Sequence, residues 1–143
     1  MNIFTIGFSG KSAEEFFTLL TQNGVKKLID IRLNNKSQLA GFTNAKHLPY
    51  LLRLHNIDYE YRPELAPTKD LLDGYKKKEI SWENYEKIYH QILIERDILK
   101  KISIDDFENS VLLCSEPTAK QCHRRLAAEY IADNFKDIKI THL

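Results

Sequence analysis

Apolar and polar positions along the chain repeat with two periods, which predict short buried strands joined by amphipathic helices. Residues 2–6 are apolar and β-branched and stop at a glycine, as in a buried strand that ends in a tight turn. The next apolar run has helical spacing and begins at Ser12, with Glu15 placed as in a capping box. Residues 25–31 predict a second buried strand. This order is typical of a right-handed βαβ unit, whose two strands are parallel.

The rest of the chain continues this alternation after a long polar loop at residues 34–47. The further predicted elements are a short helix at 49–55, an edge strand at 57–62, helical segments to about residue 101 with Ser81 capping a long helix, a buried strand at 111–114, a helix that begins near Thr118, and a last strand around 138–140. Together they predict one domain over residues 1–143. Its fold class is a three-layer, Rossmann-like α/β arrangement with a mostly parallel sheet of about four to five strands.

Composition narrows the classes of function that fit this fold. The 143 residues are 43% hydrophobic, which suits one compact core. Lys and Arg total 21 against 20 Asp and Glu, so the net charge of +1 argues against a dedicated nucleic-acid binder or a polybasic membrane-surface protein, although a local basic patch stays open. The chain starts without a basic leader and has no long apolar stretch, so neither secretion nor membrane insertion is expected. With only two cysteines, we expect a reducing, cytoplasmic setting.

Polar residues of chemical interest follow three of the predicted strands. In open parallel sheets, ligands bind beyond the carboxyl ends of the strands, so these residues are expected to meet in one crevice. The alternative is that each segment is only a turn, or that Asp30 and Arg32 form a local ion pair. The residues concerned are Gly7 and Ser9 after the first strand, Asp30 and Arg32 after the second, and Cys114, Ser115 and Glu116 after the late strand.

The segment from Cys114 onward is the densest in reactive side chains. A helix that begins near Thr118 directs its free amides and positive dipole end toward the strand end, where they lower the pKa of a thiol and bind anions. Cys122 falls in the first turn of that helix and is equally well explained as a small core residue. His123 and Arg124 come next, and their positive charge near a helix N-terminus makes sense if an anion or thiolate is bound there. Their neighbour Arg125 is expected to face solvent.

The spacing of these residues does not match that of known cysteine-based mechanisms. Cysteine phosphatase and rhodanese-type loops often place an arginine six residues after the cysteine, but that position after Cys114 is Lys120, and the position six after Cys122 is not an arginine either. A zinc site built from the cysteines, His123 and Glu116 is awkward because Cys122 and His123 are adjacent on one helix, so no metal is expected. A redox disulfide between the two cysteines is conceivable but lacks the CxxC spacing.

Two further features of the sequence bear on ligand binding. The aromatic residues from Trp82 to Tyr89 fall at helical spacing, which favours core packing over stacking against a flat substrate. The polar loop that follows Arg32, with Lys36 in it, is long enough to close over a polar ligand. The basic run at residues 76–78 is interpreted as a solvated face.

Four segments resemble a known family in the right order along nearly the whole chain: TIGFSGKS, DIRLNNKSQLAGF, PELAP and LLCSEPTAKQCHRRLAAEY. The family is DUF488, a domain family of unknown function, and the Cys-His-Arg element is its most specific feature. Many members carry His where this chain has Phe8, and a loop rich in proline and arginine at positions 33–39, so the chain resembles a subgroup. The resemblance implies a compact α/β domain with a shared pocket but no established reaction. The implied pocket residues are Gly7, Ser9, Asp30, Arg32, Cys114, Glu116, Cys122, His123 and Arg124.

The first functional hypothesis is a small enzyme that acts on an anionic or nucleotide-like small molecule. Cys114 or Cys122 is the nucleophile, His123 carries a proton or partners the thiolate, and Asp30 or Glu116 orients the other groups. Substrate binding is assigned to Gly7, Ser9, Arg32, Lys36 and Arg124. The alternative hypothesis is a module that binds phosphate, a nucleotide or nucleic acid without chemistry, through the same basic side chains and the helix amides. No particular cofactor follows from the sequence.

Overall fold

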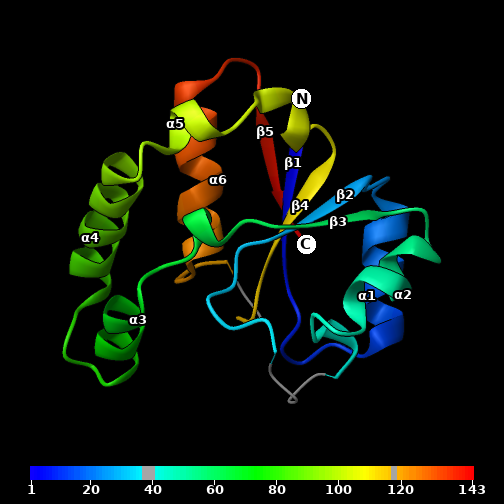
Figure 1. The fold of residues 1–143 in the computed structure, drawn as a ribbon, viewed down its shortest axis with the longest axis horizontal. Coiled ribbons are helices and arrows are strands. Elements are labelled where there is room, and N and C mark those ends of the chain that lie inside the picture. Colours follow the sequence, from blue (N-terminus) through cyan, green and yellow to red (C-terminus); the bar gives the residue numbers. More distant parts are fainter. Residues whose placement is uncertain (37–40, 117–118) are drawn as a thin grey trace.

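The computed structural model describes residues 1–36, 41–116 and 119–143. Its described strands form one sheet in which every pairing is parallel, in the order β3-β2-β4-β1-β5 (Figure 1). The strands are β1 (Asn2–Gly7), β2 (Lys27–Asp30), β3 (Asp58–Tyr61), β4 (Ser110–Cys114) and β5 (Lys139–His142). The predicted α/β class is therefore confirmed, and the sheet is parallel throughout.

Helices cover both faces of this sheet and complete the three predicted layers. Figure 1 shows α1 and α2 on one side and the other helices on the opposite side. The helices are α1 (Ala13–Gln22), α2 (Leu48–Arg53), α3 (Lys69–Lys76), α4 (Trp82–Glu95), α5 (Ile98–Lys101) and α6 (His123–Asn134), with short 3₁₀ turns at Gly41–Thr43, Pro63–Leu65 and Ile104–Phe107. None of the helices in the described parts is long and apolar enough to cross a bilayer.

The core has two halves because side chains alternate across the strands. Along β1, Ile3 packs with α4 and α6, whereas Phe4 packs with α1 and α2. In β4, Leu112 and Val111 divide between the same two halves. Strands buried on both faces account for the continuous apolar runs in the sequence.

The N-terminus of α1 confirms the predicted cap at Ser12. The backbone N–H of Glu15 donates to Ser12 Oγ over 3.1 Å. The Glu15 carboxylate accepts from the Ser12 hydroxyl at 3.3 Å rather than from the backbone N–H of Ser12. The cap is thus a variant of the capping box that still satisfies one of the free amides of the helix.

The helix after β4 begins later than predicted. Residues 117–118 lie outside the described residues, so the expected cap at Thr118 is not seen, and α6 starts at His123 with Cys122 as its N-cap. Cys122 has extended backbone angles, φ −140° and ψ 142°, which place it before the first turn rather than within it. A side-chain hydrogen bond from Tyr75 to Gln121 ties the preceding segment to α3. That contact comes from a distant part of the chain, which local cap signals do not reveal.

Gly7, at the end of β1, lies very close to the segment that follows β4. A Cβ atom at Gly7 would collide with the carbonyl oxygen of Glu116 and with Nη1 of Arg124. Just beyond, the N–H of Ser9 donates to the carbonyl of Ser115 over 3.1 Å. The absence of a side chain at Gly7 therefore lets the segment after β4 pack directly on the end of β1.

Candidate functional site

A cavity of about 580 Å³ lies at the carboxyl ends of the strands, where α3 and α4 approach the start of α6. This is the position at which parallel α/β sheets bind ligands. Its walls come from segments far apart in the sequence. They are Phe8, Ser9, Arg32, Leu33, Asn34, Pro67, Leu72, Tyr75, Lys76, Trp82, Tyr85, Cys114, Ser115, Glu116, Gln121, Cys122 and His123.

Most of the residues singled out in the sequence meet at this cavity, but they do so in different ways. Those that line it are Ser9, Arg32, Cys114, Glu116, Cys122 and His123. Three others lie behind the lining: Gly7 under the segment after β4, Asp30 against Arg32, and Arg124 against Cys114. Lys36 is exposed and lies outside the described lining of the cavity.

The two cysteines face each other on the cavity wall. Cys114 ends β4 and Cys122 precedes α6, and their Sγ atoms are in direct contact. The Cα atoms are 7.7 Å apart, beyond the roughly 7 Å within which two cysteines are bridged without backbone movement. We therefore describe them as a facing cysteine pair. Both are almost fully buried, with 1% and 3% of their surfaces exposed.

Arg124 places a positive charge directly behind Cys114. Its Nη1 donates to Cys114 Sγ at 3.5 Å and to the carbonyl oxygen of Glu116 at 2.7 Å, and among the described residues its Nε has no acceptor. Burial lowers the pKa of Arg124 to about 10, so the guanidinium is still charged at neutral pH. A buried cation against a sulfur atom favours the thiolate over the thiol. Arg124 is thus positioned to act on Cys114 rather than on a ligand in the cavity.

His123 is neutral at pH 7, which changes the role expected from its place near the helix N-terminus. Burial lowers its pKa to about 4. Its Nε2 lies 2.8 Å from the carbonyl oxygen of Ile31, and because a carbonyl only accepts, Nε2 carries the proton. Nδ1 is then left with a lone pair. His123 can accept a proton or a hydrogen bond through Nδ1, but it does not supply a positive charge.

Arg32 both forms the local ion pair considered above and lines the cavity. Its Nε and Nη2 donate to the two carboxylate oxygens of Asp30, each over 2.9 Å, and Nη2 also donates to the carbonyl of Thr43 at 2.7 Å. Its guanidinium lies 5.6 Å from the centre of the Phe8 ring. These contacts hold the side chain in one orientation, and they use only two of its three guanidinium nitrogens. The remaining nitrogen, Nη1, makes no hydrogen bond with the described residues.

Two tyrosines of β3 support this ion pair and were not recognised in the sequence. The hydroxyl of Tyr59 donates to Asp30 Oδ2 at 2.8 Å, and that of Tyr61 donates to the carbonyl of Arg32 at 3.0 Å. Burial and the neighbouring carboxylate of Asp30 raise the pKa of Tyr59 well above its ordinary value, so it stays a hydrogen-bond donor. The alternation in this edge strand already placed both tyrosines on one face. Its pairing with β2, which brings them to Asp30, is a tertiary feature.

Aromatic side chains of α3 and α4 form the opposite wall, packed against one another. The rings of Trp82 and Tyr85 are stacked with centroids 4.9 Å apart, and the Tyr85 ring is also stacked with Tyr89 at 6.3 Å. The Arg125 guanidinium lies 5.8 Å from the centre of the Trp82 ring. Because neighbouring side chains cover the ring faces, the predicted core interpretation holds, and stacking against a flat substrate is not favoured.

One basic residue differs from expectation and another gains a second contact. Arg125 does not simply face solvent, because it pairs with Glu86 at 2.9 Å and with Glu129 at 3.4 Å. Lys76, at the end of α3, is exposed like the rest of the run interpreted as a solvated face, and its side chain also borders the cavity. Packing between helices explains both contacts, since α4 brings Glu86 to Arg125 and α3 brings Lys76 to the cavity rim.

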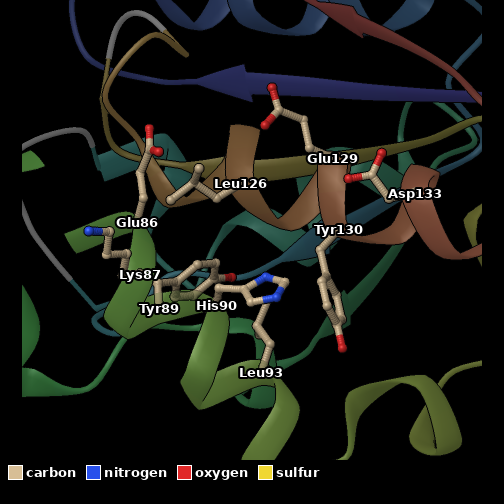
Figure 2. A pocket seen from close by; sticks show the side chains of 9 residues that line it. All are labelled: Glu86, Lys87, Tyr89, His90, Leu93, Leu126, Glu129, Tyr130 and Asp133. Atoms are coloured by element: carbon tan, nitrogen blue, oxygen red, sulfur yellow. The ribbon is translucent and has the colours of Figure 1, made fainter. Parts of the chain in front are cut away.

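A second cavity, of about 300 Å³, lies between α4 and α6, and its lining contains none of the residues predicted to act in catalysis or substrate binding (Figure 2). Its acidic side chains are Glu86, Glu129 and Asp133, and the first two already pair with Arg125. Within the described ranges no three His, Cys, Asp or Glu side chains are grouped so as to hold a metal ion. The cavity at the strand ends is therefore the candidate functional site.

The fold and the site define a class: a three-layer α/β domain with a wholly parallel sheet and a cysteine-containing cavity at the strand ends. Residues 12–131 match the family described as "Domain of unknown function DUF488", and the chain belongs to this family. The comparisons find no match among curated proteins and none among solved structures. The family assigns the chain no reaction, so a function has to be argued from the site itself.

Proposed function

We propose that this protein is an enzyme that uses Cys114 as a thiolate nucleophile on a small anionic substrate. One observation carries the proposal: the buried Arg124 guanidinium lies against Cys114 Sγ on the wall of a cavity that Arg32 also lines. The guanidinium favours the reactive, charged form of the thiol. Arg32, on the cavity wall, offers an anion a positive group in a fixed orientation.

The other residues support these two arginines. Asp30 holds two nitrogens of Arg32 and leaves Nη1 for a ligand. The carbonyl of Glu116 fixes Nη1 of Arg124 beside the sulfur. His123 supplies Nδ1 as a hydrogen-bond acceptor, since its other nitrogen is committed to Ile31. The proposed mechanism thus pairs a stabilised nucleophile with a positioned anion-binding group and a neutral hydrogen-bond acceptor.

The pH dependence of alkylation tests the nucleophile. Iodoacetamide is applied to the wild type and to the variants Cys114→Ser and Cys122→Ser, and the modified residue is identified by mass spectrometry. In the Cys122→Ser variant, Cys114 is expected to react with an apparent pKa clearly below the ordinary thiol value of about 8.5. An ordinary pKa for Cys114, or reaction only after unfolding, rules out the proposed thiolate chemistry.

The charge of the alkylating agent tests for an anion-binding cavity. Iodoacetate carries a negative charge and iodoacetamide does not. If the cavity attracts anions, the rate of alkylation of Cys114 by iodoacetate divided by its rate with iodoacetamide should be higher than the same ratio for a free thiol in solution. Lys76→Gln, on the cavity wall, is expected to lower this ratio by roughly twofold to fivefold at low salt. Lys77→Gln is the matched control, since Lys77 is exposed and lies outside the described lining. Equal ratios in the two variants would argue against attraction of anions into the cavity.

A second candidate function is binding of a phosphate-bearing ligand without chemistry. The near-complete burial of both cysteines favours it, because it leaves little sulfur surface for a substrate to reach. Under this alternative the double variant Cys114→Ser/Cys122→Ser binds inorganic phosphate as tightly as the wild type, and Cys114 shows the ordinary thiol pKa. The alkylation experiment therefore distinguishes the two candidates.

A further inference from the structure

The proposed nucleophile has a second cysteine against it, and the mechanism above gives that residue no role. Cys114 and Cys122 are eight positions apart in the sequence, yet their sulfur atoms are in contact and both border the same cavity. The two residues belong to different elements, one to the end of β4 and the other to the cap of α6. A covalent bond between them would therefore link the sheet to the helix across the cavity wall.

We propose that Cys114 and Cys122 form a reversible disulfide in response to hydrogen peroxide, and that this oxidation switches the site off. The inference rests on the proposed function, since it concerns regulation of the same thiolate. The thiolate that Arg124 favours for attack on a substrate is also the form that reacts with peroxide. Cys122 then acts as the resolving residue.

The reaction balances with peroxide as the oxidant. The Cys114 thiolate attacks one peroxide oxygen, the O–O bond breaks, and a sulfenic acid forms at Cys114 while the other oxygen leaves as hydroxide. The sulfur of Cys122 attacks Cys114 Sγ, the S–O bond breaks, and the departing hydroxide takes the thiol proton and leaves as water. The two sulfurs together lose two electrons, and peroxide gains them. A thiol reductant such as dithiothreitol reverses the reaction.

The fold links this bond to the shape of the cavity. Closing the disulfide requires the 7.7 Å Cα separation to shorten, so the end of β4 and the cap of α6 must approach each other. Ser115, Glu116 and Gln121 lie between the two cysteines and line the cavity. Oxidation thus consumes the nucleophile and displaces part of the wall.

Thiol counting and mass spectrometry test the proposal on the intact protein. The reduced wild-type protein is treated with one equivalent of hydrogen peroxide in a non-denaturing buffer. We expect both thiols to disappear together, a mass loss of two hydrogens, and full recovery with dithiothreitol. In Cys122→Ser the sulfenic acid has no partner and should be trapped at Cys114 by dimedone, whereas Cys114→Ser should react far more slowly. Sulfinic acid in the wild type without an intramolecular disulfide, or disulfides only between molecules, would overturn the proposal.

A binding measurement tests the effect on the site. The affinity for inorganic phosphate is compared between the reduced and the oxidised wild type, and the oxidised form should bind roughly fivefold or more weakly. Equal affinity would overturn the switch. The proposed function is tested separately, by the pH dependence of alkylation of Cys114 in the Cys122→Ser variant, which cannot form the disulfide. An ordinary thiol pKa in that variant would rule out the proposed function without bearing on disulfide formation.

Discussion

Substitution of Gly7 by alanine is the sharpest test of how the fold builds the site. The added methyl group meets the carbonyl oxygen of Glu116 and Nη1 of Arg124. Neither neighbour moves freely, because the first is backbone and the second is buried and hydrogen-bonded to it. Overpacking of a well-packed site costs about 1–3 kcal/mol, and the rigidity of both neighbours places Gly7→Ala at about 3 kcal/mol.

Urea unfolding measures this cost. With an m-value of about 2 kcal/mol/M, a loss of about 3 kcal/mol lowers the unfolding midpoint by about 1.5 M. The matched control is Gly41→Ala, where a Cβ meets nothing within 4 Å, and its effect should stay below about 1 kcal/mol. Gly7→Ala should also raise the alkylation pKa of Cys114, since the added methyl group displaces Arg124 from the sulfur. A Gly7→Ala protein as stable as the wild type would refute the close packing of the segment after β4 on β1.

Two further predictions concern stability and its pH dependence. The pKa of His123 is lowered from 6.5 in the unfolded chain to about 4 in the fold, so the unfolded chain binds its proton first and stability falls as the pH drops from 6.5 toward 4. The loss of unfolding free energy reaches about 3 kcal/mol at pH values below 4. His123→Gln should flatten the plot of unfolding free energy against pH between pH 6.5 and 4. An unchanged slope would show that His123 is not the source of this pH dependence. Tyr59→Phe removes a hydrogen bond to buried Asp30 and should cost about 1.5–3 kcal/mol in urea unfolding, against about 1 kcal/mol for Tyr61→Phe, which loses a bond to a neutral carbonyl. Equal effects of the two variants would contradict the role of Tyr59 in holding the ion pair.

The elements of the fold were largely predictable because their signals are local. Apolar runs that end at turn residues marked the strands, and Ser12 marked the start of α1 through a hydrogen bond that closes within four residues. The start of α6 differs from the prediction for the opposite reason, because it depends on contacts with distant residues. In the described residues, Cys122 holds the cap position, and Gln121 accepts a hydrogen bond from Tyr75 of α3. Such a contact with a distant helix leaves no signal in the local sequence.

By itself, the sequence determined that chemically active side chains follow the strand ends, since hydrophobic periodicity gives the positions of strands and turns along the chain. Only the tertiary structure decided the surroundings of each of these side chains. It placed Arg124 behind Cys114, left Lys36 outside the described lining and brought Lys76 to the cavity. It also made His123 neutral through burial and paired Asp30 with a tyrosine from β3. The charge state, burial and orientation of these side chains depend on contacts between segments far apart in the chain. Hydrophobic periodicity within one segment does not predict those contacts.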